Sequence, residues 1–460
     1  MKLALKNFGP FKHTEINMSP FTIFIGPNAA GKSMLLYLIW TLYTVELKWD
    51  NLRALLHEHY EKLVRVSSPE EKSQVLYELY CTIYEELPHL LRDNLVNLLQ
   101  DAFGTSLTEL VTRGEDRADI IVASDKGPRV LKLTIQDEEL SITTFDEGRD
   151  LLRNLIYFRW EDYPGGRGRV AVVDTKSGET LFETETFDIG ARDHVVAELS
   201  GLIPVAFMYV FDYCPYVSTM LLPDGRAGIL RLREALAHAL FVTSWKYIYV
   251  NAVDREFFKN LIATERTPVT DKYSLELANL LEREFSVEFT CRGEKFTVID
   301  LVTGVEMPIE KAPSGLREIA PLVLLLKYRG IRKVPYIVMI EEPETHLHPD
   351  AQSLIIRVLA ALVKCGECKV VITTHSNVVL DEVDNLIALS KLSQNEKPKL
   401  GYLPFEGLKS YDVSIYLVKR GGIVEPLQIT DEGIPETELD EVLRQIYNRH
   451  VKVRTYARTK

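Results

Sequence analysis

Residues 26–33 read Gly26-Pro27-Asn28-Ala29-Ala30-Gly31-Lys32-Ser33, and this stretch decides the fold of the chain. It has the form G-x-x-x-x-G-K-[ST], in which main-chain N–H groups and the N-terminus of the next helix bind phosphate oxygens. Gly26 and Gly31 are needed where a side chain would collide or where the backbone angles exclude one. The apolar run Phe21–Ile25 precedes the stretch, and a leucine-rich helix is predicted from Ser33. A phosphate-binding loop requires this order of strand, loop and helix.

A second motif with chemical meaning lies far along the chain, where the apolar run Ile337–Ile340 ends in Glu341 and Glu342. Ligands of parallel α/β sheets bind at the carboxyl ends of the strands, which is where these acids would lie. We expect Glu341 to hold Mg²⁺ and Glu342 to polarise an attacking water. The alternative is that two acids merely end a strand. The wide separation of the two motifs indicates a nucleotide site with a large insertion in its middle.

Two further segments are candidates for the same site. Residues 312–318 form a turn of small residues that enters an apolar helix, where the Ser314 hydroxyl and the Gly315 N–H could bind a phosphate. A plain N-capped helix is the alternative for this segment. The apolar run Val370–Thr373 leads to His375, which could contact a terminal phosphate, although a histidine at a strand end is often structural.

Alternation of helix and strand beyond residue 310 predicts a parallel α/β sheet. The expected elements are helix Leu316–Lys327, strand Tyr336–Ile340, helix Pro349–Val363 and strand Val370–Thr373. Further strands are expected at Ile415–Val418 and Val424–Ile429, followed by a short helix, Glu436–Tyr447. Pro426 limits the second of these strands to the edge of a sheet.

The middle of the chain changes character several times. Residues 49–110 have an amphipathic helical pattern, which Pro88 interrupts. Residues 115–200 favour strands separated by Gly and Asp turns, with the clearest runs at 119–122, 130–135 and 169–173. Helices are predicted again from about 195 to 285, and two short strands, Val287–Thr290 and Lys295–Ile299, follow.

Taken in order, these elements resemble the ATPase heads of the ABC superfamily, in particular the soluble branch that contains RecF, the SMC proteins and the OLD-type ATPases. Leu5–Phe11 is similar to the N-terminus of that branch. Residues 314–318 are similar to its signature motif, and residues 341–349 to its Walker B motif and D-loop. His375 matches the switch histidine. The resemblance covers residues 1–45 and 300–390 closely and the middle only loosely.

The resemblance implies an α/β fold, a P-loop NTPase of ABC-ATPase type with a parallel core sheet, an antiparallel β-lobe and a large helical insertion. The implied organisation is a first part of lobe I (1–48), a helical insertion (49–110), the β-rich part of lobe I (111–200), a helical or mixed insertion with a possible dimerisation region (201–300), lobe II (301–395), and a C-terminal β/α extension with a basic tail (396–460).

The resemblance also implies ATP and Mg²⁺ as cofactors and a homodimer, in which ATP is sandwiched between Lys32 of one subunit and Ser314 of the other. The implied nucleotide-binding residues are Gly26, Asn28, Ala29, Ala30, Gly31, Lys32, Ser33, Met34, Ser314, Gly315 and Arg226. Ser33 and Glu341 are the implied metal ligands. Glu342, His375 and Lys32 are the implied catalytic residues.

The sequence departs from the family pattern at three points. Glu341 stands where the family usually has Asp, and the signature segment has one glycine instead of two. No convincing Q-loop glutamine is present, because Gln136 falls inside a strand pattern. In its place, residues 222–228 are similar to a Pro/Arg/Gly segment of OLD-like ATPases. Arg226 is therefore a candidate for contact with a phosphate or with a second subunit, and a simple surface turn is the alternative.

The predicted activity is slow Mg-dependent ATP hydrolysis that drives or gates a DNA-repair or anti-phage defence complex. OLD nucleases carry a C-terminal Toprim domain, for which the residues after His375 are too few, so a separate nuclease or effector partner is expected. DNA is a possible further partner, and no membrane partner is expected. Two alternatives are a nucleotide-gated scaffold with little turnover and a RecF/SMC-like DNA-binding ATPase. A transporter ATPase is disfavoured by the large insertion and the missing Q-loop.

The composition of the chain restricts the classes of function and the cellular compartment that we expect. The net charge of −12 excludes a chain that binds nucleic acid over its whole surface, and five cysteines suit a reducing compartment. The N-terminus turns polar at once, and the apolar stretch 202–222 contains Asp212 and two prolines, so we expect a cytoplasmic protein.

The cysteine pair near residue 365 and the basic C-terminal residues can each be interpreted in two ways. The lone pair Cys365 and Cys368 is a zinc motif or, more simply, a packing or disulfide feature. The basic residues after Arg444 contact a phosphate backbone or are merely solvated.

Overall fold

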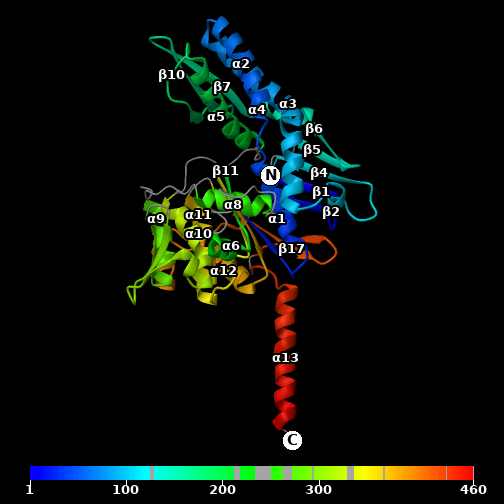
Figure 1. The fold of residues 1–460 in the computed structure, drawn as a ribbon, viewed down its shortest axis with the longest axis vertical. Helices are drawn as coiled ribbons and strands as arrows, with labels where there is room; N and C mark the ends of the chain where they lie inside the picture. Colours follow the sequence, from blue (N-terminus) through cyan, green and yellow to red (C-terminus); the bar gives the residue numbers. More distant parts are fainter. Residues whose placement is uncertain are drawn as a thin grey trace. The chain divides into compact units, whose positions relative to one another are not determined.

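The computed structural model describes residues 1–124, 129–211, 218–233, 250–262, 272–292, 295–328, 336–365, 368–430 and 433–458 (Figure 1). The chain divides into two compact units. The first unit contains residues 1–18, 37–219 and 334–336, and the second contains residues 19–36, 220–333 and 337–460.

A five-stranded antiparallel sheet in the order β2-β1-β4-β5-β6 forms one part of the first unit. Its strands are β1 (Lys2–Phe8), β2 (Phe11–Asn17), β4 (Arg117–Ala123), β5 (Arg129–Gln136) and β6 (Glu139–Thr144). Every second residue of β5 from Leu131 to Ile135 is buried, which is the alternation of a sheet with one covered face. The strands predicted at 119–122 and 130–135 are confirmed, whereas β2 was not predicted.

The rest of the first unit combines a four-stranded sheet with helices. The sheet has the order β10-β8-β7, with β9 also paired to β8. Its strands are β7 (Ile156–Tyr163), β8 (Arg167–Asp174), β9 (Thr180–Glu183) and β10 (Phe187–Asp188). The helices are α2 (Trp49–Arg65), α3 (Pro69–Phe103), α4 (Asp146–Leu155) and α5 (Arg192–Phe211), with a 3₁₀ turn, η1, at Thr108–Leu110. The helix α4 was not predicted from the sequence.

The helix α3 corrects the expected break at Pro88, because it runs through this residue without ending. A capping box formed by Ser68 and Glu71 starts the helix, and Gly104 in the left-handed conformation ends it. Leu87 and Leu91, on either side of the proline, are both buried. The packed apolar face therefore outweighs the loss of one main-chain hydrogen bond.

A six-stranded sheet in the order β11-β15-β16-β3-β17-β18 organises the second unit. The strands are β3 (Phe21–Ile25), β11 (Ser218–Leu222), β15 (Tyr336–Glu341), β16 (Cys368–Thr374), β17 (Val413–Lys419) and β18 (Ile423–Leu427). All residues of β3 are buried, and β3 runs parallel to both β16 and β17. A strand that is apolar throughout is expected where both faces of a parallel sheet are covered. β18 lies at the end of the order, so the edge position predicted from Pro426 is confirmed.

The second unit also contains residues 32–36 of α1 (Lys32–Thr44) and several complete helices. They are α6 (Arg226–Arg231), α8 (Ala252–Ile262), α9 (Lys272–Glu284), α10 (Ser314–Tyr328), α11 (Pro349–Cys365), α12 (Asn377–Leu389) and α13 (Glu438–Arg458). A small antiparallel sheet, β12 (Val287–Arg292), β13 (Lys295–Asp300) and β14 (Glu306–Pro308), and the 3₁₀ turns η3 (Ile309–Lys311), η4 (Lys397–Leu400) and η5 (Ser410–Asp412) complete it. The predicted alternation of helix and strand after residue 310 is confirmed.

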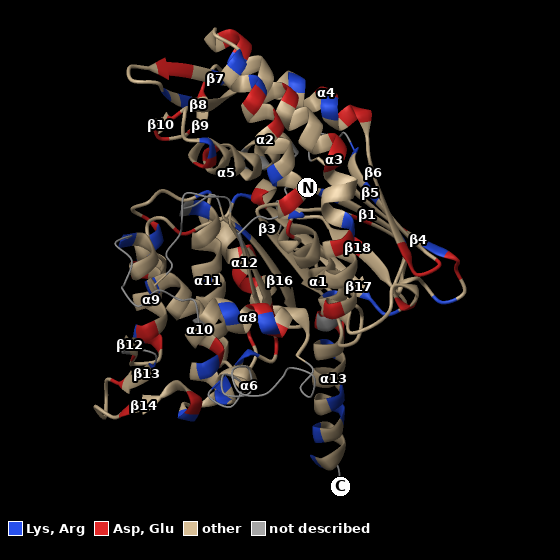
Figure 2. Cartoon of the chain, turned by 45° about the horizontal axis from the view of Figure 1, so that its top comes forward, with Lys and Arg blue, Asp and Glu red and all other residues tan. Residues whose placement is uncertain are grey.

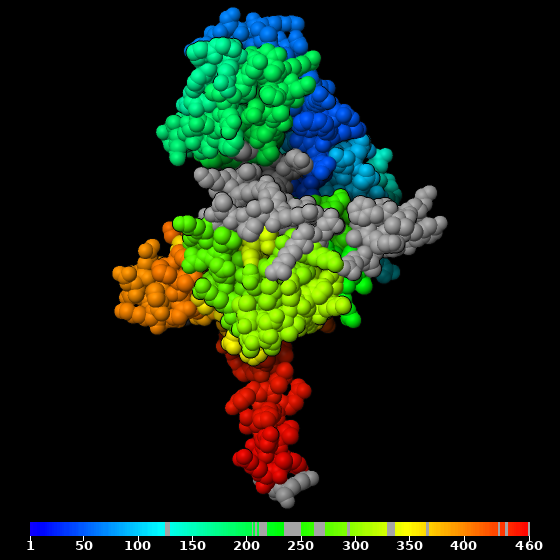
Figure 3. All heavy atoms as spheres, turned by 60° about the vertical axis from the view of Figure 1, so that its left-hand side comes forward, coloured from blue at the N-terminus to red at the C-terminus, as the bar shows by residue number. Residues whose placement is uncertain are grey.

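The helix α13 is longer than predicted, since it continues beyond Tyr447 to Arg458. Its apolar side chains Leu443 and Ile446 are more than half exposed. Figure 2 colours the Lys and Arg positions along the helix blue, and Figure 3 shows the atoms of the helix in red. The sequence analysis ended this helix at Tyr447, and neither of its two readings of the basic residues from Arg444 onward, contact with a phosphate backbone or solvation, included a helix.

No helix in the described ranges is long and apolar enough to cross a membrane. The apolar stretch 202–222 is divided between the end of α5 and the strand β11, and residues 212–217 lie outside the described ranges.

Candidate active site

The loop between β3 and α1 has the backbone conformation that its glycines allow. Gly26 has φ 155°, and a Cβ atom there would lie 2.0 Å from the Val418 carbonyl oxygen. Gly31 has φ 104°, and Ala29 has φ 60°. These positive φ angles turn the chain tightly at the end of the buried strand. Asn28 is exposed at the crest of the loop, so main-chain groups there are open to a ligand.

The side chain of Lys32 folds back into this loop. Its Nζ donates to the carbonyl oxygens of Gly26 at 2.9 Å and Pro27 at 3.0 Å. Burial lowers the pKa of Lys32, and the charges of Glu342, Glu344 and Glu341 oppose that shift. The lysine of the loop therefore lies in the field of three carboxylates that follow the strand β15.

Glu341 and Glu342 stand at the carboxyl end of β15, as the sequence predicted. The N–H of Glu342 donates to the Thr373 carbonyl oxygen at 2.9 Å, which fixes it to the neighbouring strand β16. Glu342 has φ 44°, an uncommon angle for a residue with a side chain. The Asp224 N–H donates to Glu341 Oε2 at 3.2 Å.

His375 lies directly beside the carboxylate of Glu342. The ring Nδ1 is 3.2 Å from Glu342 Oε1 and 3.6 Å from Glu344 Oε1. Glu344 Oε1 accepts hydrogen bonds from Thr374 Oγ1 at 2.6 Å and from the His375 N–H at 3.0 Å. Glu344 thus holds the strand end that carries the histidine, and the histidine meets Glu342.

The other carboxylate oxygen of Glu344 has no hydrogen-bond partner among the described residues, although the side chain is only 3% exposed. Buried polar atoms are nearly always satisfied, so an orphaned oxygen near a lysine indicates a place for a polar ligand. Together with the open N–H groups of the loop, this donor set fits a phosphate group and its cation. The sequence analysis included Glu344 in the segment 341–349 but assigned it no role.

Within the described ranges, no group of three or more His, Cys, Asp or Glu side chains is arranged to hold a metal ion. Mg²⁺ commonly keeps several waters and uses one or two protein ligands beside substrate phosphates. Ser33, which is exposed at the start of α1, and Glu341 therefore match the number and type of oxygen ligands that Mg²⁺ takes from a protein when it also binds substrate phosphates. Asp254 on α8 was also missed by the sequence reasoning; burial and the charge of Glu341 raise its pKa.

Ser314 and Gly315 are at the N-terminus of α10, as predicted. Ser314 is exposed, and a Cβ on Gly315 would lie 3.2 Å from the His346 carbonyl oxygen. No hydrogen bond or ion pair within the described part of the chain joins these two residues to loop 26–33. The structure therefore brings Lys32, Glu341 and His375 together but leaves Ser314 and Gly315 outside that cluster.

Comparison with known proteins decides the family at this point. The sequence model of the AAA ATPase domain family matches residues 1–110 and 242–380, which is more than half of the chain. The chain belongs to the AAA ATPase domain family. This match confirms the prediction of a P-loop ATPase fold.

Individual relatives of this AAA ATPase-family chain are distant. An OLD nuclease of Thermus scotoductus (strain ATCC 700910 / SA-01) is 20% identical over 439 residues, which span 92% of this chain and 67% of that protein. The chain is thus similar to an OLD protein, as predicted.

Similar solved structures include an SMC head domain from Thermotoga maritima, at 12% identity, 93% coverage of this chain, 98% coverage of that chain and a TM-score of 0.34. Another is the Smc head domain with an extended coiled coil bound to the C-terminal domain of ScpA, derived from Pyrococcus furiosus. Its values are 12% identity, 97% and 98% coverage, and a TM-score of 0.39. These TM-scores are low, so the fold assignment rests on the sheet order and the family match.

Arg226 of this ATPase-family chain does not lie in a surface turn, so that alternative is wrong. Its side chain is 1% exposed. The guanidinium pairs with Glu318 and donates to the main-chain oxygens of Glu341 and Glu342. Burial lowers the pKa of Arg226, and the charge of Glu318 opposes that shift.

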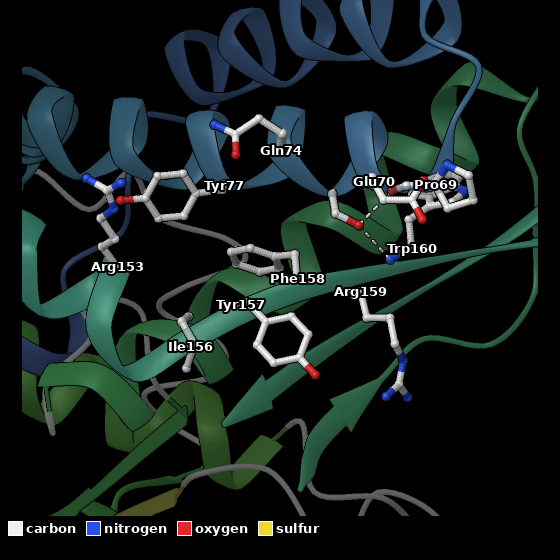
Figure 4. Close-up of a pocket in the computed structure, with 11 residues that line it drawn as sticks. Pro69, Glu70, Gln74, Tyr77, Arg153, Ile156, Tyr157, Phe158, Arg159 and Trp160 are labelled. Atoms are coloured by element: carbon white, nitrogen blue, oxygen red, sulfur yellow. Dashed lines mark hydrogen bonds between the residues drawn. The ribbon is translucent and has the colours of Figure 1, made fainter. Parts of the chain in front are cut away.

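A separate cavity of about 660 Å³ lies in the first unit between α3 and β7 (Figure 4). Aromatic side chains of Tyr77, Tyr157 and Trp160 line it, and the main-chain N–H of Trp160 donates to Ser73 Oγ at 3.0 Å. None of the predicted site residues is in its lining.

The Cys365–Cys368 segment is only partly described, because Gly366, Glu367 and the side chain of Cys365 lie outside the described part. Cys368 is buried, and burial raises the pKa of its thiol to about 12.

Proposed function

We propose that this chain binds Mg-ATP at the carboxyl edge of the sheet formed by β3, β15 and β16 and hydrolyses it to ADP and phosphate. One observation carries the proposal. Lys32 of the glycine loop, the carboxylates after β15 and His375 after β16 meet at one edge, with the histidine Nδ1 3.2 Å from Glu342 Oε1. Parallel sheets bind their ligands at this edge.

Binding is assigned to the loop and the start of α1. Main-chain N–H groups of the loop and of Met34 would hold phosphate oxygens, and Lys32 would exchange its carbonyl partners for the β- and γ-phosphates. Ser33 and Glu341 would hold Mg²⁺. The loop residues with this role are Gly26, Asn28, Ala29, Ala30 and Gly31.

Catalysis is assigned to Glu342 and His375. Bound Mg-ATP supplies an electrophilic phosphoryl group whose charge the metal and Lys32 neutralise. The Glu342 carboxylate orients a water and accepts its proton, which is the general-base role of a carboxylate. His375 keeps the Glu342 side chain in place from Oε1, and Glu344 keeps the histidine main chain in place.

Completion of the site is assigned to a second copy of the chain. Ser314 is exposed at a helix N-terminus, which is suited to phosphate binding. Because no interaction within the described ranges joins it to its own loop, we propose that Ser314 and Gly315 contact the ATP of the partner copy. The proposed assembly is a homodimer that closes on ATP.

The wider role that we propose is a motor or sensor in DNA repair or anti-phage defence, acting with a separate nuclease or effector. Its support is the 20% identity to an OLD nuclease. DNA is a candidate regulator, which can be examined by measuring ATP hydrolysis with and without duplex DNA.

The test of the central activity is a comparison of phosphate release by the wild type, Glu342→Gln and a control, Glu425→Gln. Glu425 is an exposed acid on the edge strand of the same sheet. We expect wild-type turnover for the control and a loss of about 100- to 10,000-fold for Glu342→Gln. Full activity of Glu342→Gln would remove the assigned base. ATP-induced association of the wild type without turnover would favour the nucleotide-gated scaffold.

A further inference from the structure

Arg226 is the first residue of α6, a helix of one and a half turns, and one of the most buried charged side chains of the second unit. A buried charge is tolerated only when it is paired and hydrogen-bonded. Its partners therefore show what the structure gains from keeping an arginine at this position.

Four N–H groups of the guanidinium point to main-chain oxygens. Nη1 donates to the Glu341 oxygen at 2.7 Å and to the Pro223 oxygen at 3.1 Å, and Nη2 donates to the Glu342 oxygen at 3.1 Å. Nε donates to the Glu318 oxygen at 3.2 Å. Arginine has five such donors, so at most one is left for any other ligand.

A buried carboxylate balances the charge. Glu318 Oε2 is 2.8 Å from Arg226 Nε, and both side chains are 1% exposed. Glu318 Oε1 lies 3.1 Å from Nδ1 of His346, which follows the acidic turn. Glu318 is one helical turn beyond Ser314 on α10. The pair thus connects the helix of Ser314 with the main chain of Glu341 and Glu342.

The main chain of Glu342 needs such support. Its φ of 44° lies in a region that is unfavourable for a residue with a side chain and persists only when the surroundings hold it. Thr373 holds the N–H side of this residue, and Arg226 holds its carbonyl oxygen together with the Thr345 N–H. If the carbonyl were released, the peptide could rotate and the carboxylate would leave His375.

We propose that Arg226, with Glu318 as its counter-ion, is a positioning residue that fixes the main chain of Glu342 for hydrolysis. The inference rests on the proposed function, because it assigns a structural support to the base of that reaction. Arg226 then sets the turnover number and leaves ATP affinity largely unchanged. This differs from direct contact with a phosphate, which would set affinity.

Two variants separate these roles. Arg226→Lys keeps a charge beside Glu318 but replaces a planar fork by a single ammonium, which cannot reach the same carbonyl oxygens together. The double variant R226M/E318Q removes both buried charges at once, so it avoids leaving one of them unpaired. The two together keep the test valid if either one folds poorly.

Arg357 provides a matched control. It is a largely buried arginine on α11 whose Nε and Nη2 each lie 2.9 Å from an oxygen of Glu406, and it also donates to the Gly401 oxygen. The variants R357K and R357M/E406Q make the same chemical changes away from Glu342. Any general effect of altering a buried arginine appears in both sets.

The measurements are kcat and KM for ATP, equilibrium binding of a fluorescent ATP analogue, and amide hydrogen exchange without nucleotide. For both Arg226 variants we expect kcat to fall about 10- to 100-fold and analogue affinity to change by less than about threefold. Exchange of the amides in 342–346 should rise, while that of the amides in 31–35 stays unchanged. The Arg357 variants should keep wild-type kcat and wild-type exchange at 342–346.

Three outcomes would overturn the proposal. Wild-type kcat in either folded Arg226 variant would show that Glu342 needs no such support. A loss of analogue affinity with unchanged exchange at 342–346 would assign Arg226 to the nucleotide instead. Equal losses in the Arg226 and Arg357 variants would show a general effect on folding. Absence of hydrolysis by the wild type would contradict the proposed function itself, and the exchange measurement would still test the support of Glu342.

Discussion

The five-stranded sheet of the first unit and the six-stranded sheet of the second unit both have buried acidic side chains on their strands or strand ends, but the partners of these side chains differ. Asp119 on β4 is 6% exposed and lies 3.2 Å from Lys132 Nζ, 3.1 Å from Arg117 Nη2 and 2.8 Å from Thr134 Oγ1. Glu344 after β15 is 3% exposed, yet its Oε2 has no partner among the described residues.

This difference indicates which buried charges stabilise the fold and which serve a ligand. Around Asp119 the positive partners are complete, so the ionised form is favoured in the folded protein. Around Glu344, the positive charges of Lys32 and Arg226 interact with the carboxylates of Glu341 and Glu344, and the phosphate and metal proposed for this site would add further partners. Sites that bind ligands are commonly kept at some cost in stability. Substitutions in the two regions should therefore have opposite effects on activity and stability.

Among the substitutions that test this difference, Lys32→Met is expected to have the largest effect. The variant removes the cation of the glycine loop, whose charge interacts with Glu341, Glu342 and Glu344, and a hydrogen bond to a charged group is worth about 1.5–3 kcal/mol. ATP affinity should therefore fall about 10- to 100-fold, as measured by titration calorimetry. Lys369→Met, at a partly exposed position on β16, serves as the control and should bind ATP normally. Unchanged ATP affinity of Lys32→Met would show that the lysine of the glycine loop does not take part in nucleotide binding.

Glu344→Gln should separate activity from stability. The amide oxygen can still accept from Thr374 and the His375 N–H, so the fold is retained. The negative charge beside Lys32 is lost, and turnover should fall about tenfold or more because the charges of the site are part of its preorganisation. The free energy of unfolding should be unchanged or higher by about 1 kcal/mol. Lower stability of Glu344→Gln with full turnover would contradict the account, because Glu344 would then stabilise the fold as Asp119 does.

Asp119→Asn should do the opposite. Loss of the charged acceptor weakens its contacts with Lys132 and Arg117, and we expect the free energy of unfolding to fall by about 1–2 kcal/mol. ATP turnover per folded molecule should be unchanged, because Asp119 is not one of the residues proposed to bind or hydrolyse the nucleotide. Chemical denaturation of the two forms, with the ATPase rate measured in parallel, tests both statements. A large loss of turnover would show that the first unit takes part in the reaction.

The pH dependence of stability sharpens this prediction. Burial raises the pKa of Asp119, but hydrogen bonds from Thr134 and Lys132 and the charges of Lys132 and Arg117 outweigh burial and lower it overall. A lowered folded-state pKa stabilises the fold above the unfolded value, about pH 4, and this contribution is lost as pH falls toward the folded value. Below about pH 4 the wild type should therefore lose more stability than Asp119→Asn. Parallel acid curves for the two forms would contradict this.

The smallest effect is expected on α13. Leu443 is 58% exposed, so Leu443→Gln removes little buried apolar surface. The free energy of unfolding should change by less than about 0.5 kcal/mol. A large destabilisation, measured in dilute solution, would mean that this face of α13 is covered by another molecule or by an undescribed segment.

Some of the site could be predicted from the sequence because its signals are local. The glycine loop and the two acids after β15 each combine an apolar strand with polar residues at its end, and parallel strands bring such ends together. His375 follows the same rule. The prediction did not depend on knowing which strands are neighbours.

Other parts depend on tertiary contacts and could not be predicted. Arg226 was predicted to contact a phosphate or a second subunit, with a surface turn as the alternative, since nothing in the local pattern shows that Glu318, on a helix distant in the sequence, supplies its counter-ion. Glu344 has no periodic signal of its own. Pro88 ends a helix in most local contexts, and here the packed face of α3 outweighs that preference. The sequence analysis predicted only the first part of α13. The apolar residues of this helix are exposed, so its length is not explained by packing against a core.

The most direct test of the account is the solution mass of Glu342→Gln with and without Mg-ATP, measured by light scattering together with chemical analysis of the bound nucleotide. The account predicts that Mg-ATP doubles the mass and that the complex holds unhydrolysed ATP, because the loop and Ser314 are intact and only the base is lost. An unchanged mass with no retained ATP would contradict it, since the glycine loop, the acids after β15 and Ser314 would then not form an ATP site between two copies.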